Sequence, residues 1–173
     1  DYQSGQLDVY AYLKFSLEPL TRIPFAERQY LHQLFMQEVI APLMLTKAQD
    51  LIAKHRLSKD RLLVVTATNS FIAKPICSAL GIEDVIATEA EIIDGVFTGK
   101  VVGTPSFAEG KVERLEQWLR NNQETKDGSY FYSDSINDLP LLLQVNHPVA
   151  VDPDDKLREQ AIKRGWEIIS LRD

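Results

Sequence analysis

The sequence has 173 residues, 45% of them hydrophobic and 25% charged, which is the composition of a globular chain that can bury one core. Its 19 Lys and Arg against 25 Asp and Glu give a net charge of −6, which argues against nucleic-acid backbone binding but permits a cation cofactor. No apolar run reaches the length of a membrane span, and no signal peptide is visible. The single cysteine, Cys77, cannot form an internal disulfide, so we expect a cytoplasmic protein.

The first third of the chain has the pattern of helices alone. Apolar residues recur every three or four positions from Leu7 to Leu17, which predicts a helix that Pro19 ends. A second helix is expected to open at Pro24, because proline suits a first helical turn, and a third is expected over residues 46–55. We therefore expect residues 1–57 to form a helical unit that is distinct from residues 58–173.

From residue 58 onward, strands alternate with helices. Short runs rich in apolar and β-branched residues predict strands at 62–67, 129–133, 147–151 and 166–170. Residues 84–103 predict a strand followed by a hairpin at about 90–103, which turns at Asp94-Gly95. This alternation predicts an α/β fold over residues 58–173, with a doubly wound, Rossmann-like parallel sheet and helices on both faces.

Polar residues follow several of these strands where each strand ends. Ligands of open α/β sheets bind outside the carboxyl ends of the strands, and helix N-termini there offer N–H groups to anions. Carboxylates at the same edge suit Mg²⁺, which commonly shares its ligand shell with a phosphate. The candidate residues are Thr66, Ala67, Thr68 and Asn69 after one strand, Ser133, Asp134, Asn137 and Asp138 after a second, and Asp152 after a third.

Each of these signals also has a purely structural explanation. The two aspartates of the 134–138 segment could cap a helix, Thr66 could be an ordinary strand former, and Lys111 could be a solvated helix lysine. The two asparagines could be caps or turn residues. No single signal is specific, whereas their order along the chain is informative.

That order is a Thr after a buried strand, then a Gly-Lys pair opening a later helix, then a strand running into Ser-Asp-x-x-Asn-Asp. It resembles the haloacid dehalogenase superfamily, and in particular its phosphoserine-phosphatase-like branch with a helical cap. The resemblance covers residues 58–173, including the hairpin, and extends more loosely to residues 1–57 as the remnant of a cap. It implies a Mg²⁺-dependent hydrolase of a small phosphomonoester, such as phosphoserine or histidinol phosphate, with an aspartyl-phosphate intermediate and no nucleic-acid or membrane partner.

The resemblance also implies a role for each candidate residue. Phosphate binding is implied for Thr66, for Ala67, Thr68 and Asn69 after it, and for Asn137. Lys111 is implied to stabilise the nucleophile and the charge of the phosphoryl group. Asp134 and Asp138 match the acidic metal motif, in which the first ligates Mg²⁺ and the second supports the metal site and the lysine.

One family motif is not found. The family's nucleophile and general acid lie in an Asp-x-Asp that ends a buried strand, and neither Asp1 nor Asp8 follows such a strand. We expect this motif upstream of residue 1, with its strand between those ending at Thr66 and Ser133, so that the present chain alone is inactive. The alternatives are a catalytically inert phosphate- or metal-binding α/β domain, and a ligand-binding domain in which Lys111 and the aspartates are surface residues.

Overall fold

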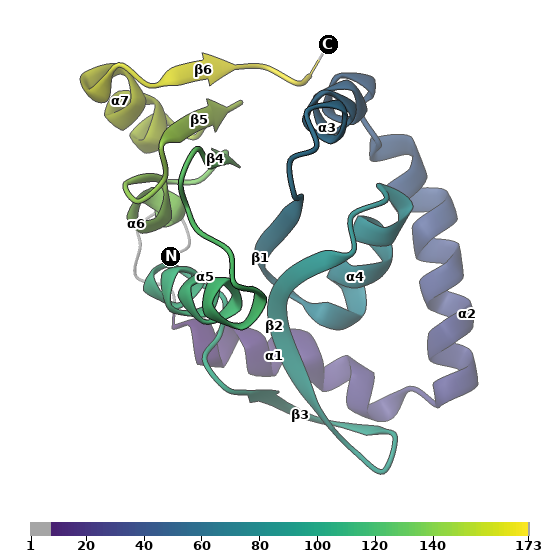
Figure 1. Cartoon of the computed structure of the whole chain (residues 1–173). Coiled ribbons are helices and arrows are strands. Elements are labelled where there is room, and N and C mark those ends of the chain that lie inside the picture. Colours follow the sequence, from purple (N-terminus) through teal and green to yellow (C-terminus); the bar gives the residue numbers. More distant parts are fainter. Residues whose placement is uncertain (1–7, 173) are drawn as a thin grey trace.

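The computed structural model describes residues 8–172, with α5, α6 and α7 on one side of the strands and α3 and α4 on the other (Figure 1). The predicted α/β fold is confirmed. None of the helices in the described part of the chain is long and apolar enough to cross a membrane. The helices are α1 Val9–Arg22, α2 Phe25–Phe35, α3 Thr46–Leu57, α4 Ser70–Ala79, α5 Glu109–Asn122, α6 Leu139–Leu142 and α7 Asp155–Arg164. The strands are β1 Leu63–Asn69, β2 Asp84–Ile93, β3 Val96–Val102, β4 Tyr130–Ser133, β5 His147–Val151 and β6 Glu167–Ile169.

The first helix differs from its prediction at the C-terminal end. α1 continues through Pro19 to Arg22, so the predicted end at Pro19 is wrong. Leu13 and Leu17 are 3% and 0% exposed, and α1 packs on β3, so burial against the hairpin outweighs the lost helix hydrogen bond. Leu7, the first residue of the predicted stripe, lies outside the described residues, as does Asp1.

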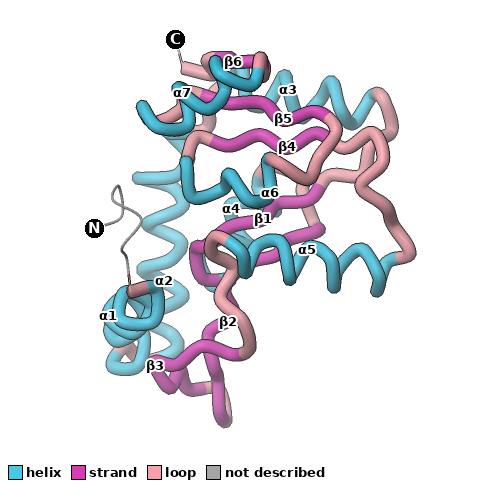
Figure 2. Tube along the Cα trace, turned by 90° about the vertical axis from the view of Figure 1, so that its left-hand side faces the viewer, coloured by secondary structure: helices cyan, strands magenta, loops and turns pink. Residues whose placement is uncertain are grey.

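The strands form two sheets of three strands each, in the orders β1-β2-β3 and β4-β5-β6 (Figure 2). β1 pairs with β2 in parallel, and β4, β5 and β6 are parallel to one another. β2 and β3 form the predicted antiparallel hairpin. Its turn residues Asp94 and Gly95 have φ values of 51° and 78°, the left-handed geometry that a tight hairpin turn requires.

The two sheets are not paired with each other, and their facing edges are β1 and β4. A groove of about 520 Å³ lies between these edges, lined by residues 63–65 of β1 and 130–132 of β4. We call it the β1–β4 groove. Edge strands carry backbone N–H and C=O groups that a further strand can pair with. This is the position in which the family resemblance leads us to expect the additional strand.

A histidine connects the two sides of the β1–β4 groove. His55 lies near the end of α3, and its Nδ1 atom is 2.7 Å from Asp60 Oδ2, just before β1. Its Nε2 atom is 2.7 Å from the Tyr132 hydroxyl of β4. Burial also raises the pKa of Tyr132 above its ordinary value. The imidazole therefore connects the side of the groove formed by β1 to the side formed by β4.

Each sheet has its own hydrophobic core, and the short helix α6 contributes to both. Consecutive leucines of α6 point into the two cores, which couples the packing of one half to that of the other. The first core is built from Ile86, Leu115, Leu119 and Leu141, and the second from Leu142, Ala150, Leu157 and Ala161.

Candidate functional site

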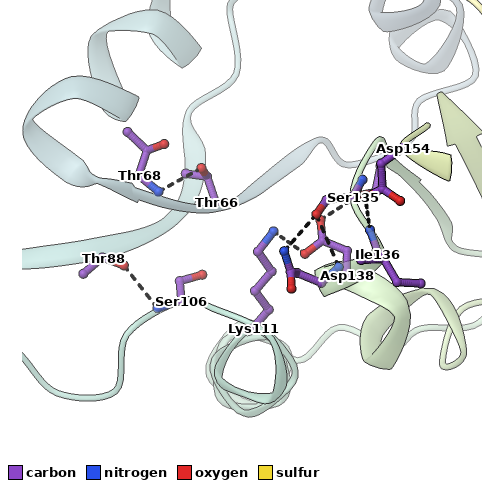
Figure 3. Close-up of polar contacts among 11 residues, drawn as sticks. Thr66, Thr68, Thr88, Ser106, Lys111, Ser135, Ile136, Asp138 and Asp154 are labelled. Atoms are coloured by element: carbon purple, nitrogen blue, oxygen red, sulfur yellow. Dashed lines mark hydrogen bonds and ion pairs between the residues drawn. The ribbon is translucent and has the colours of Figure 1, made fainter. Parts of the chain in front are cut away.

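A buried ion pair lies at the centre of the candidate site (Figure 3). Lys111, in the first turn of α5, places its Nζ atom 2.6 Å from Oδ1 of Asp138, and the two residues are 8% and 7% exposed. The other oxygen of Asp138 accepts a hydrogen bond of 2.7 Å from the Ser133 hydroxyl. Buried charges are tolerated when they are paired and hydrogen-bonded, and the Asp138 carboxylate meets both conditions. The interpretation of Lys111 and Asp138 as solvated surface residues is therefore wrong.

The loop before α5 is wound tightly and delivers Lys111 to this position. The Phe107 N–H donates to Pro105 O at 2.9 Å, and the Gly110 N–H donates to Phe107 O at 2.8 Å. Ala108 has a φ of 46°, which is strained for a residue with a side chain. A Cβ atom on Gly110 would lie 2.2 Å from Pro105 O, so the residue before the lysine has to be glycine. The Gly-Lys pattern thus has a steric cause.

The predicted phosphate-binding segment lies across from Lys111 at the same edge of the fold (Figure 3). The pairing of β1 with β2 becomes irregular between Val65 and Asn69, which is the segment that contains Thr66 and Thr68. The Thr68 N–H donates to the Thr66 hydroxyl oxygen at 3.1 Å. Among these predicted site residues Lys111 and Asp138 contact each other directly, whereas the Thr66 hydroxyl is engaged by the backbone of its own segment.

The two predicted asparagines have local structural partners. The Asn69 side chain caps α4 by accepting the Ile72 N–H at 3.2 Å. The Asn137 side-chain amide donates to the Ser135 hydroxyl at 3.2 Å. Both contacts are those of turn and cap residues, and the amide of Asn137 still lies in the same short loop as the two aspartates.

Four aspartates from two neighbouring segments, Asp134, Asp152, Asp154 and Asp155, line a hollow of about 480 Å³. The Ser170 hydroxyl, with help from the Leu171 N–H, holds the pKa of Asp152 below its ordinary value. Both carboxylate oxygens of Asp154 accept backbone N–H groups. Within residues 8–172 the carboxylates of Asp134 and Asp155 have no partner, so both are open to a ligand, and Asp134 is the one in the segment that also carries Asp138.

The described residues offer at most part of the ligand set that a Mg²⁺ ion would need. No cluster of three His, Cys, Asp or Glu side chains in residues 8–172 could hold a metal ion by itself. Both oxygens of Asp138 are engaged by Lys111 and Ser133. Mg²⁺ usually takes only one or two protein carboxylates and completes its shell with water and phosphate. The exposed Asp134 carboxylate therefore fits the ion as one ligand of a set.

Two residues of the site were not assigned a role from the sequence. Ser133 stands in the Ser-Asp-x-x-Asn-Asp pattern, and its position directly before Asp134 was the available signal. Asp154 stands among three aspartates within four residues, and nothing in the sequence separates it from Asp152 or Asp155. Only its contacts across the chain identify it.

Known proteins share this fold and much of this sequence. A family model described as haloacid dehalogenase-like hydrolase matches residues 5–143. A protein named Histidinol-phosphatase from Neisseria meningitidis is 44% identical over 99% of this chain and 79% of its own length. A crystal structure of a protein of unknown function from Bordetella pertussis has a TM-score of 0.94 and 42% identity, covering 99% of this chain and 78% of that one.

A more distant structure shares the fold alone. It is described as a phospho-aspartyl intermediate analogue of phosphoserine phosphatase, and it has a TM-score of 0.70 at 18% identity. The match covers 99% of this chain and 76% of that one.

Proposed function

The chain belongs to the haloacid dehalogenase-like hydrolase family, and we propose that it forms most of a Mg²⁺-dependent phosphatase of small phosphomonoesters. The observation that carries this proposal is the buried Lys111–Asp138 pair facing Thr66 where β1 and β4 end. A fixed cation beside hydrogen-bond donors is the environment that phosphoryl transfer needs. Histidinol phosphate is the first candidate substrate, because the relative named for it is 44% identical, and phosphoserine is the second.

Each residue has a separate task in this proposal. Thr66 and the N–H groups of the 66–68 segment, with Asn137, donate hydrogen bonds to the phosphoryl oxygens. Lys111 balances the charge that develops during transfer, while Asp138, held by Ser133, keeps the lysine side chain in place. Asp134 would hold Mg²⁺, which neutralises phosphate charge when it is bound. Phosphoryl transfer requires mainly positioning and charge stabilisation, and these residues supply both.

The nucleophile would come from a strand that fills the β1–β4 groove. This proposal is supported by the two unpaired edges and by the apolar lining that Leu63, Val65 and Phe131 provide. Each buried backbone group left unpaired costs about 1–3 kcal/mol, so occupation of the groove by a strand is strongly favoured. The carboxyl end of such a strand would emerge between Thr66 and Ser133, beside Lys111.

The reaction then proceeds in two steps. A carboxylate oxygen of the inserted strand attacks phosphorus, and the ester oxygen leaves with a proton from the second Asp of the Asp-x-Asp motif. Water then cleaves the aspartyl-phosphate, which releases inorganic phosphate and restores the carboxylate. Lys111 would compensate the negative charge that develops in both steps.

We also propose the division into a cap remnant at residues 1–57 and a core at residues 58–173. α1 packs on the hairpin strand β3, as a cap element leaning over the core would. α3 has a second role, because its residues Leu51, Ile52 and His55 line the β1–β4 groove. Closure of the α1–α2 part over the site would exclude water from side reactions.

The test is phosphate release by the full gene product from a panel that includes histidinol phosphate and phosphoserine, with Mg²⁺ or with EDTA. We expect Mg²⁺-dependent release, highest kcat/KM for histidinol phosphate, and a loss of about 10²–10³-fold in Lys111→Met. Asp134→Asn should abolish the Mg²⁺-dependent release, whereas Glu159→Gln, an equal charge change at an exposed position outside the hollow, should not. Release that is absent for every ester, or unaffected by EDTA and by both site variants, contradicts the proposal and favours the inert binding domain.

A further inference from the structure

Asp154 ties the loop that carries Asp134 to the start of α7. Its Oδ2 atom accepts the N–H of Ile136 at 2.8 Å, and its Oδ1 atom accepts the N–H of Leu157 at 2.8 Å (Figure 3 shows Asp154 beside Ile136). Its own backbone N–H donates to Asp134 O, also at 2.8 Å. One residue thus holds the segment after β4 at two points while it caps the helix after β5.

These contacts come from outside the 134–138 loop, which otherwise depends on short-range bonds. Ser135 N–H donates to Ser133 Oγ at 3.2 Å, and Asp138 N–H donates to Ser135 O at 3.0 Å. Both bonds turn the chain toward Asp138, whose carboxylate is buried on Lys111. Neither contacts Asp134, which is exposed and whose side chain has no partner in the described part of the chain.

Asp154 lies in the same acidic hollow as Asp134, but its carboxylate is already engaged by the backbone. Two N–H groups occupy its two oxygens, and the N-terminus of α7 favours its negative charge. An aspartate engaged in this way has a geometric role. It fixes the direction in which the open carboxylate of Asp134 faces the site.

We propose that Asp154 is the positioning residue for the Asp134 metal ligand, acting through Ile136 and the Asp134 backbone. This inference rests on the proposed function, because it assigns Asp134 to Mg²⁺. Groups that orient metal ligands by hydrogen bonding commonly change metal affinity by about 10–100-fold when they are removed. The contacts of Asp154 are solvent-exposed, so we expect the lower end of that range, about 10-fold.

The test compares Asp154→Ser with Glu159→Gln in the full gene product. A serine can still cap α7 but is too short to reach Ile136, so the helix is retained while the hydrogen bond from the Ile136 N–H is lost. Asp154→Asn is the second variant, since Asn caps well and presents only one acceptor oxygen. Glu159 is the matched control because it is exposed, lies on the same helix, carries the same charge and does not line the hollow.

Two readouts are needed, the Mg²⁺ Kd from titration calorimetry and the hydrogen-exchange rate of the 134–138 amides without metal. In Asp154→Ser we expect a Kd about 10-fold higher and exchange about fivefold faster, with both values unchanged in Glu159→Gln. Unchanged exchange, or an unchanged Kd in a variant whose exchange is faster, overturns the positioning role while the proposed function stands. If the parent protein binds no Mg²⁺, the proposed function fails at its metal, and this inference fails with it.

Discussion

The change Gly110→Ala tests how the loop before α5 sets the position of Lys111. The added Cβ would lie 2.2 Å from Pro105 O, and real Cβ contacts essentially never fall below 3.0 Å, so the chain has to shift by about 0.8 Å. Lys111 follows directly, and a shift of that size would lengthen its 2.6 Å contact with Asp138 to about 3.4 Å, which is longer than a strong hydrogen bond. Overpacking of this kind costs about 1–3 kcal/mol, and misplacement by about 1 Å costs about 10²-fold in rate.

The assay is urea unfolding together with kcat/KM for phosphate release, both with the full gene product. Gly165→Ala is the matched control: it adds the same methyl group at a φ of 68°, has nothing within 4 Å, and lies at the end of α7. The control should lose about 1 kcal/mol from backbone strain and keep its activity. Wild-type activity in Gly110→Ala would show that the loop does not set the position of the lysine.

Two further substitutions and one labelling experiment test other parts of the structure. Lys111→Met leaves Asp138 buried without its cation and should lower the free energy of unfolding by about 3–5 kcal/mol. In a double-mutant cycle, adding Asp138→Asn should recover part of that loss, whereas strictly additive losses would argue against a direct interaction of the pair. His55→Phe keeps an aromatic ring but removes the hydrogen bonds to Asp60 and Tyr132 through which the imidazole connects the two sides of the β1–β4 groove. We expect the free energy of unfolding in urea to fall by about 2 kcal/mol, and an unchanged midpoint would contradict this role of His55. Cys77 is 4% exposed, and burial raises the pKa of its thiol. Iodoacetamide at pH 8 should therefore label Cys77 about 10²-fold more slowly in the native protein than in urea. Equal labelling rates would mean that the surroundings of Cys77 open readily.

The elements that sequence could predict are those with a local cause. Strands and helices of the α/β part follow from short-range apolar patterns, and the Asp94-Gly95 turn follows from residues that tolerate positive φ. Lys111 was selected from its order among other motifs, and the structure adds the physical reason, which is the steric need for glycine before it.

The features that sequence could not predict depend on contacts between distant segments. Pro19 predicted a helix end, but burial of Leu17 on β3 carries α1 past it. The tie from Asp154 to Ile136 and the bridge from His55 to Tyr132 join residues 18 and 77 positions apart, and no local pattern marks them. Such contacts become visible only once the fold brings the partners together.

The most direct test of the proposed phosphatase is the intact mass of the full gene product, acid-quenched during turnover of histidinol phosphate with Mg²⁺. We predict a mass increase of one phosphoryl group, and peptide mapping should place it on an aspartate outside residues 1–173, in the strand that fills the β1–β4 groove. The adduct should be lost in Lys111→Met. Turnover with no adduct, or an adduct on a residue of this chain, would contradict a nucleophile supplied by that strand.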